Sequence, residues 1–199
     1  MIAIIDYGMG NLKSIYKALK YVNADSIITS DPEVVKNADA VVLPGVGAFK
    51  DAMECIVSSN MEEAIKVSIG QEKPFLGICL GMQVLFEKSY EYGEYNGLSI
   101  VKGEVLKLPD SFKVPHMGWN NLKILNEDPL FYGVDAPYVY FVHSYYCKPA
   151  ENIISSTTEY GMDVTASIWK GNVHGLQFHP EKSGEQGLKM LDNFRRMIK

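Results

Sequence analysis

Residues 74–83 read Pro-Phe-Leu-Gly-Ile-Cys-Leu-Gly-Met-Gln. The apolar run 74–78 predicts a buried strand, and a helix is predicted near 80–88. Gly77-Ile78-Cys79-Leu80-Gly81 therefore has the glycine-x-nucleophile-x-glycine pattern in the strand-to-helix context that this pattern needs. A residue on such a turn takes up a strained backbone that pushes its side chain out over the sheet edge. The segment predicts an α/β fold in which Cys79 is a candidate nucleophile.

The residues before this segment alternate between strand and helix patterns. Continuous apolar runs at 2–6, 26–29 and 40–43 are typical of strands buried on both faces. Helices are predicted at 11–22, after Asp31-Pro32, and over 48–70. Strands separated by helices pair in parallel through right-handed crossovers. We expect an open, mostly parallel twisted sheet flanked by helices, with its chemistry at the carboxyl ends of the strands.

The residues after this segment are richer in strand patterns. Short β-type runs occur at about 104–108, 121–125, 138–146, 153–158, 164–169 and 173–178. They predict antiparallel strands added to the sheet from the second half of the chain, with a small side sheet. A final helix is predicted near 184–198. Since no linker or repeat is visible, we expect one domain spanning 1–199.

Composition narrows the classes of function. The net charge is −5 and hydrophobic residues make up 47% of the chain, which favours a globular domain and argues against a nucleic-acid partner. No apolar run reaches membrane-spanning length, and the N-terminus does not resemble a signal peptide, so we expect a cytoplasmic protein without a membrane partner. The Gly8-Met9-Gly10 turn lacks the third glycine of a dinucleotide fingerprint, and no Cys-x-x-Cys spacing suggests a metal site. No cofactor and no metal are expected.

A nucleophilic cysteine needs a base, and His179 is the best of the four histidines. It ends the apolar run 173–178 and is followed by Pro180 and Glu181, whose carboxylate is close enough to orient the imidazole. The alternative is a structural histidine at a strand end. We prefer that alternative for His116, His143 and His174. Cys55 and Cys147 are interpreted as packing residues.

Taken together, these residues carry a family resemblance. Gly77–Gln83 and His179–Glu181 resemble the class I, or triad, glutamine amidotransferases, and Pro44–Gly47 resembles their glycine-bearing loop. The resemblance implies that Cys79 attacks the side-chain amide of L-glutamine, that His179 acts as the base and that Glu181 orients His179. It also implies an oxyanion hole. Its donors are the backbone amides of Leu80, Val46 and Gly47.

The resemblance further assigns residues to the substrate. By analogy with the family, five residues hold glutamine: Gly45, Gln83, Glu91, Ser144 and Tyr145. Gln83 and Glu91 are expected at its α-amino and carboxylate ends. The amidotransferase-type loop and Gln83 also argue against a cysteine peptidase on the same fold.

A narrower resemblance implies a partner protein. Asp6–Leu12, Pro115–Asn120 and His143–Tyr146 are similar to the family members that pass ammonia to a separate cyclase subunit, a (β/α)8 barrel, in a heterodimer. Four residues are expected at that interface: Asn11, Met117, Trp119 and Lys182. Two alternatives stay open. One is a glutaminase that feeds another synthase, such as one in surface-sugar amination, and the other is a non-catalytic regulatory relative.

Overall fold

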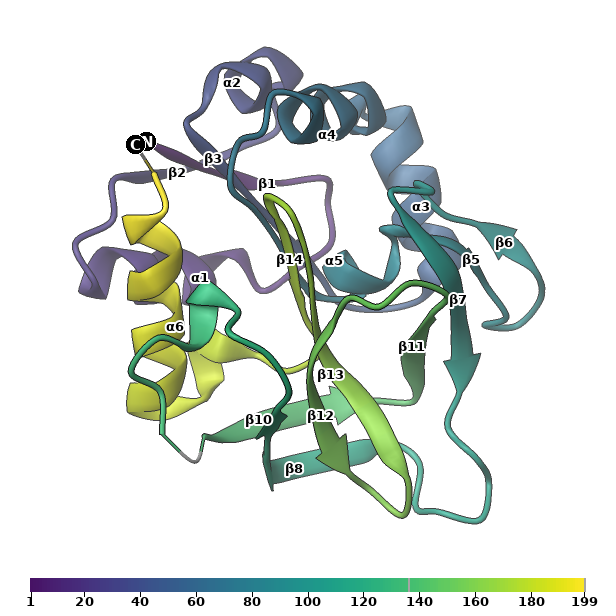
Figure 1. Ribbon diagram of the computed structural model, residues 1–199. Coiled ribbons are helices and arrows are strands. Elements are labelled where there is room, and N and C mark those ends of the chain that lie inside the picture. Colours follow the sequence, from purple (N-terminus) through teal and green to yellow (C-terminus); the bar gives the residue numbers. More distant parts are fainter. Residues whose placement is uncertain (136, 199) are drawn as a thin grey trace.

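The computed structural model describes residues 1–135 and 137–198. Strands and helices alternate in its first half (Figure 1). These elements are β1 (Ile2–Ile5), α1 (Leu12–Tyr21), β2 (Ser26–Thr29), α2 (Pro32–Asn37), β3 (Ala40–Gly45), α3 (Phe49–Ser58), α4 (Met61–Gly70), β4 (Phe75–Cys79) and α5 (Leu80–Gln83). The start of α2 shows local control by sequence, since the Asp31 carboxylate accepts the Glu33 N–H at 2.9 Å and Pro32 occupies the first turn.

Strands dominate the second half, and its only long helix is the last one among the residues described. Its elements are β5 (Phe86–Ser89), β6 (Tyr95–Asn96), β7 (Val101–Lys107), β8 (His116–Asn121), β9 (Lys123–Ile124), η1 (Pro129–Phe131), β10 (Tyr138–His143), β11 (Tyr145–Pro149), β12 (Ile154–Glu159), β13 (Asp163–Lys170), β14 (Val173–Leu176), η2 (Pro180–Lys182) and α6 (Gly184–Arg196). No helix in the part that the structure describes is long and apolar enough to cross a bilayer.

The main sheet has the order β2-β1-β3-β4-β14-β13-β12-β9. The first five strands in this order are parallel, and β13, β12 and β9 are added antiparallel. This arrangement confirms the predicted fold class. Because β4 lies between β3 and β14, the cysteine at its carboxyl end stands in the middle of the sheet, beside the ends of both neighbours.

Both faces of the sheet are buried, which explains the continuous apolar strands. On β1, Ala3 and Ile5 belong to the core beneath α2, α3 and α4, whereas Ile2 and Ile4 belong to the core beneath α1 and α6. The period of two in strand side chains produces this division. Burial on both faces favours a rigid arrangement of β3, β4 and β14. The turns that carry the candidate catalytic residues follow the carboxyl ends of these strands.

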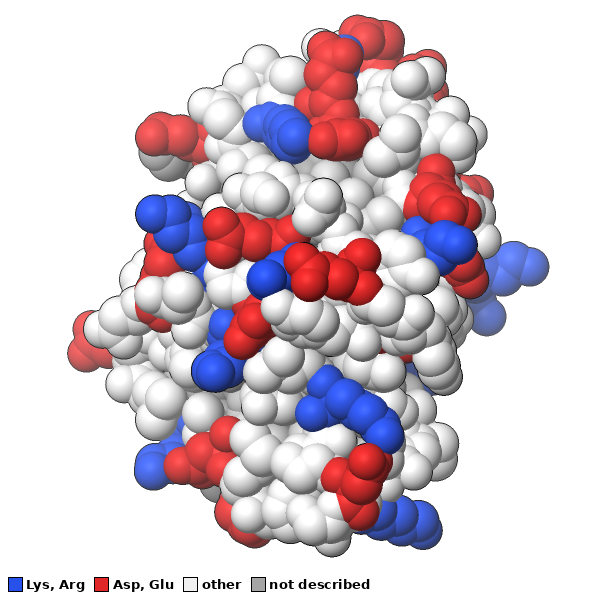
Figure 2. Space-filling view, turned by 90° about the vertical axis from the view of Figure 1, so that its right-hand side faces the viewer, with Lys and Arg blue, Asp and Glu red and all other residues white. Residues whose placement is uncertain are grey.

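Two smaller sheets adjoin the main one. β10 pairs with β8, and a second small sheet has the order β11-β7-β5-β6. Figure 2 shows the side of the molecule that carries the β5–β7 region, where basic and acidic side chains are interspersed. Ion pairs such as Lys88–Glu94 and Lys148–Glu104 contribute to this mixed pattern.

Three predicted elements have the wrong bounds. The strand predicted at about 121–125 falls on the last residue of β8 and on the short strand β9. The helix predicted near 80–88 is only α5, because the chain turns at Val84 and Phe86 begins β5, which pairs with β7. The strand predicted over 138–146 is two strands, β10 and β11, separated by Ser144. They pair with different partners, β8 and β7. The break between them matters, because it places Ser144 in the pocket described below.

Candidate active site

Cys79 occupies a strained turn between β4 and α5. Its φ of 55° and ψ of −114° are unusual for a residue with a side chain. The flanking glycines are required by space. A Cβ on Gly81 would lie 1.9 Å from the Leu43 carbonyl oxygen, and a Cβ on Gly77 would lie 2.7 Å from the Gly81 oxygen. The sequence folds this way locally because only glycine permits the tight contact between the turn and β3.

The loop that follows β3 begins beside the cysteine. In the parallel register of β3 and β4, Gly45 is the direct partner of Cys79. Val46 and Gly47 then leave the strand and are exposed, and Gly47 has a φ of +100°, which favours glycine. The predicted loop residues are therefore held next to the thiol by strand pairing.

His179 and Glu181 lie above the same edge. The His179 Nδ1 and the Glu181 Oε1 are 2.9 Å apart, and both side chains are buried. The His179 backbone N–H donates to the Tyr140 carbonyl, and its carbonyl accepts the Ser183 hydroxyl at 2.6 Å. These bonds fix the turn into η2, so the imidazole orientation is set from both its backbone and its Nδ1.

The electrostatics of His179 depend on its two acidic neighbours. Burial alone lowers the pKa of His179, but its interactions with the nearby Cys79 and Glu181 outweigh burial and raise that pKa to about 9. Nδ1 is committed to Glu181, whereas Nε2 is buried without a hydrogen-bond partner among the residues described. An imidazole held through Nδ1, with a free Nε2 near a thiol, is suited to proton transfer.

The Cys79 thiol and the His179 imidazole both line a pocket of about 320 Å³. It is lined by Val46, Gly47, Cys79, Leu80, Gln83, Glu91, Pro115, Val142, His143, Ser144, Tyr145 and His179. The pocket thus brings together the predicted nucleophile, the predicted base and the residues predicted for the oxyanion. It also includes four of the five residues predicted for the substrate. The fifth, Gly45, lies beside Cys79 in the sheet.

Glu91 is the one carboxylate in the pocket lining. Its Oε2 accepts the Phe49 N–H at the start of α3, at 2.6 Å. Burial raises the pKa of Glu91, the Phe49 N–H lowers it, and the charge of Asp51 raises it, with a net increase. The bond to α3 fixes this carboxylate at the pocket wall.

Three of the four predicted interface residues form a continuous surface on β8 and η2. Trp119 is 46% exposed, stacks on Tyr138 and contacts Tyr140 edge-on. The Lys182 ammonium lies 5.6 Å from the centre of the Tyr140 ring. Met117 is exposed on the same strand as Trp119. The fourth, Asn11, precedes α1 and is half-buried.

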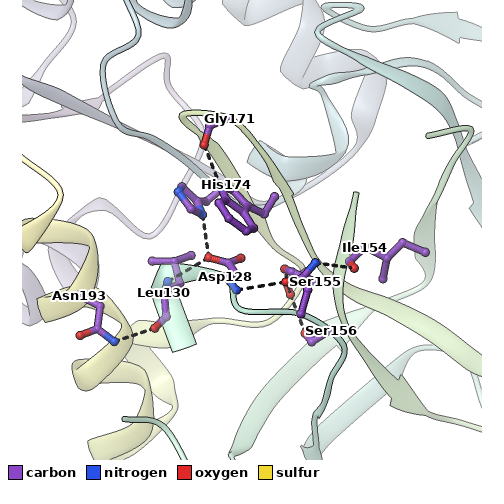
Figure 3. A network of polar contacts seen from close by, with 11 residues as sticks. Asp128, Leu130, Ile154, Ser155, Ser156, Gly171, His174 and Asn193 are labelled. Atoms are coloured by element: carbon purple, nitrogen blue, oxygen red, sulfur yellow. Dashed lines mark hydrogen bonds and ion pairs between the residues drawn. The ribbon is translucent and has the colours of Figure 1, made fainter. Parts of the chain in front are cut away.

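The other histidines occupy two different environments. His174 contacts the buried carboxylate of Asp128 at 3.1 Å (Figure 3). It also stacks on Trp169 and is not among the residues that line the pocket. His116 and His143 form a buried pair, with His116 Nδ1 2.9 Å from His143 Nε2. Both stand at strand ends, but His143 also lines the pocket. Its place there was not foreseen.

Sequence reasoning also missed two residues near the thiol. Gln177 is fully buried and donates its side-chain N–H to the Cys79 sulfur at 3.7 Å. Tyr7 has a buried hydroxyl without a hydrogen-bond partner among the described residues, and burial, then the charge of Cys79, raises its pKa. The spacing of Gln177, two residues before His179, is a signal that could have suggested that both side chains lie on one side of the chain where β14 ends.

This fold and this pocket define a class of protein, the class I glutamine amidotransferases. A family model described as "Glutamine amidotransferase class-I" matches residues 3–197. Solved structures agree on the fold. PurLQS from Thermotoga maritima aligns with a TM-score of 0.75 at 20% identity, covering 100% of this chain and 98% of that one. A putative GMP synthase subunit from Thermoplasma acidophilum aligns with a TM-score of 0.75 at 18% identity, covering 99% and 92%.

Sequence relatives are more specific. The imidazole glycerol phosphate synthase subunit HisH of Caldanaerobacter subterraneus subsp. tengcongensis is 56% identical, with 100% of this chain and 99% of the relative covered. The subunit of the same name from Methanothermobacter thermautotrophicus is 49% identical, with both chains fully covered. The chain therefore belongs to the glutamine amidotransferase class-I family and, within it, to the imidazole glycerol phosphate synthase subunits HisH.

Proposed function

We propose that this chain is the glutaminase subunit of imidazole glycerol phosphate synthase, with Cys79, His179 and Glu181 as its catalytic residues. The observation that carries the proposal is that Cys79, on its strained turn, lines the same pocket as His179, whose Nδ1 is 2.9 Å from Glu181. The strain supports a role in chemistry, since a plain structural cysteine gains nothing from a positive φ.

The first half of the reaction forms a thioester. The Cys79 sulfur attacks the side-chain amide carbon of glutamine while the His179 Nε2 holds the proton of the thiol. The tetrahedral oxyanion lies against the backbone amides of Leu80, Val46 and Gly47. One such donor commonly contributes about 3 kcal/mol. The carbon–nitrogen bond then breaks, and His179 returns the proton to the leaving nitrogen, which departs as ammonia.

The second half releases glutamate. Water attacks the thioester carbon, His179 accepts a proton from it, and the same amides stabilise the second oxyanion. The carbon–sulfur bond breaks, the sulfur regains a proton from His179, and glutamate leaves. Glu181 stabilises the imidazolium in both halves through the 2.9 Å contact at Nδ1.

The pocket wall opposite the sheet supports the choice of substrate. Glu91 offers a fixed carboxylate to the α-ammonium group of glutamine. Ser144 and Tyr145 line the pocket and are assigned to the remaining polar groups, and Gly45 borders the reacting carbon from beside Cys79. The pocket volume of about 320 Å³ suits a small amino acid.

The ammonia is proposed to pass to a cyclase subunit, a (β/α)8 barrel that makes imidazole glycerol phosphate and an aminoimidazole carboxamide ribotide in histidine biosynthesis. The exposed Met117–Trp119–Lys182 surface, together with Asn11, is proposed as the face that binds this subunit. The heterodimer is assigned to the cytoplasm, and the chain, residues 1–199, acts as one amidotransferase domain.

The test is a glutaminase assay on the purified chain, alone and with the cyclase plus its ligand. Cys79→Ala is expected to abolish ammonia release while the fold is retained. The matched control is Cys55→Ala, since Cys55 is half-buried and lies outside the pocket lining. Wild-type rates in Cys79→Ala would remove Cys79 from the mechanism. Equal rates with and without the cyclase would reject coupling to that partner.

A further inference from the structure

The Cys79 sulfur has a neighbour on the opposite side from Gly45. β14 pairs with β4 in parallel, with Gly175 opposite Gly77 and Leu176 opposite Ile78. The next step of this register brings Gln177 level with Cys79. The Gln177 Nε2 lies 3.7 Å from the sulfur, a distance suited to an N–H···S hydrogen bond. The nucleophile is therefore flanked by a glycine on one side and by a buried amide on the other.

The orientation of the Gln177 amide follows from one carbonyl. The backbone oxygen of Tyr145 can only accept hydrogen bonds, so the Gln83 atom that lies 3.1 Å from it must be the nitrogen. The same nitrogen lies 3.0 Å from Gln177, which must present its oxygen there. The Gln177 nitrogen is left facing the sulfur. Each assignment is forced by the preceding one, since the reverse would place two donors or two acceptors together.

Both side-chain N–H groups of Gln83 are engaged in this arrangement. Its two N–H groups are used by Tyr145 and Gln177, and its oxygen has no hydrogen-bond partner in the described part of the chain. Only that oxygen remains for a ligand in the pocket that Gln83 lines. The Gln83 N–H groups therefore bind other residues of the chain, not a ligand, and they fix the orientation of the Gln177 amide.

We propose that Gln177 is a positioning residue for the nucleophile: its N–H holds the Cys79 sulfur, and Gln83 locks its orientation. The proposal rests on the proposed role of Cys79. A hydrogen bond from a neutral amide stabilises a thiolate more than a thiol, because bonds to charged acceptors are the stronger ones. Gln177 thus favours the ionised sulfur and restricts it to one direction. The amide takes no proton in the reaction.

The test uses Gln177→Met, which preserves length and removes the donor. The first readout is the ultraviolet absorbance of the Cys79 thiolate, taken as the difference from the same protein carrying Cys79→Ala. At a fixed pH where only a small fraction of the wild type is ionised, we expect the thiolate fraction to fall about tenfold. The second readout is glutaminase kinetics, where kcat should fall about tenfold while KM stays within about threefold.

Asn193→Leu is the matched control, since it also removes a buried amide. Asn193 donates to the Leu130 carbonyl (Figure 3) and to the Tyr132 carbonyl, and none of these three residues lines the pocket. This variant should lower stability and leave the Cys79 thiolate unchanged. An unchanged thiolate fraction in Gln177→Met would overturn the proposal.

A second variant covers the case in which Gln177→Met does not fold. Gln83→Met leaves the Gln177 amide in place but removes the hydrogen bond from Gln83 that fixes its orientation. The thiolate fraction should therefore fall less than tenfold. A wild-type fraction in this variant would also count against the proposal. The absorbance needs no substrate, so a chain without glutaminase activity would refute the proposed function and leave the role of Gln177 open to measurement.

Discussion

Gly45 and Cys79 are direct partners in the register of β3 and β4, at the last step where these strands pair. A Cβ on Gly45 would lie 2.7 Å from the Gly81 nitrogen and 2.7 Å from the Tyr7 hydroxyl. The bare backbone of Gly45 is what allows the nucleophile turn and the candidate oxyanion loop to be neighbours.

Gly45→Ala is expected to reduce both stability and activity. The added methyl group meets backbone that cannot move away cheaply, and overpacking of this kind costs about 1–3 kcal/mol. Urea unfolding and the glutaminase rate provide the measurements. Gly70→Ala is the control, because Gly70 ends α4 with nothing within 4 Å of its added Cβ. Its stability should be unchanged or increased by up to about 1 kcal/mol. Equal stabilities of the two variants would contradict the steric argument.

Glu181→Gln should change the dependence of stability on alkaline pH. The pKa of His179 is raised from 6.5 to about 9, so this group contributes stability that is complete below pH 6.5 and lost as pH rises through 9. Deprotonation of His179 between pH 6.5 and pH 9 should lower the free energy of unfolding of the wild type by on the order of 3 kcal/mol. Removing the Glu181 carboxylate should shrink that loss, as measured by urea unfolding at pH 6 and pH 9.5. Parallel curves for the two proteins would show that Glu181 does not hold the proton on His179.

The buried pair of His116 and His143 should make the free energy of unfolding fall at acidic pH, whereas His179 makes it fall at alkaline pH. Burial lowers the pKa of His116 to about 4. Burial, opposed in part by the bond to the Tyr145 carbonyl, lowers the pKa of His143 to about 3. The unfolded chain binds these protons first, so stability falls as pH drops below 6.5.

At pH 5 the cost is about 2 kcal/mol for His143 alone. His143→Asn removes that titration and can still donate to the Tyr145 carbonyl. Its free energy of unfolding should therefore change less between pH 7 and pH 5 than that of the wild type. An unchanged difference would mean that His143 is not kept neutral by the fold.

Trp119→Ala should weaken the proposed complex with the cyclase. Exposed tryptophans at the centre of an interface often contribute 2 kcal/mol or more, so the dissociation constant should rise at least tenfold. Calorimetric titration measures it. Tyr21→Ala is the control, because Tyr21 is 75% exposed at the far end of α1 from Asn11. Equal affinities of the two variants would remove Trp119 from the binding face.

The parallel half of the fold was predictable because burial on both faces leaves a visible mark. The strands at Ile2–Ile5, Ala40–Gly45 and Phe75–Cys79 are continuous apolar runs, as is typical of parallel strands buried on both faces. The helix predicted over 80–88 was wrong because pairing of β5 with β7, which lies distant in sequence, overrides local preference. Such pairings leave no short-range signal.

The residues of the candidate site also divide into those that local sequence predicts and those that depend on contacts between distant segments. Cys79 and His179 could be found because glycine and proline mark the turns that carry them. Gln177 carries a weaker signal, since its place two residues before His179 indicates no role for its side chain until its partners are placed. The pairing of His116 with His143 also depends on register, because β8 and β10 bring residues 27 positions apart into contact.

The pocket has two walls of different origin. Cys79 and its glycine neighbour end strands of the large sheet, whereas Tyr145 begins β11 and Glu91 follows β5, both in the separate four-stranded sheet. The candidate nucleophile and two of the residues proposed to hold the substrate, Glu91 and Tyr145, therefore belong to different sheets. Small relative motions of the two sheets would alter how tightly an amino acid is gripped without distorting the nucleophile. For the same reason, ligand preference could be redesigned by exchanging residues on one wall, with the reacting groups left as they are.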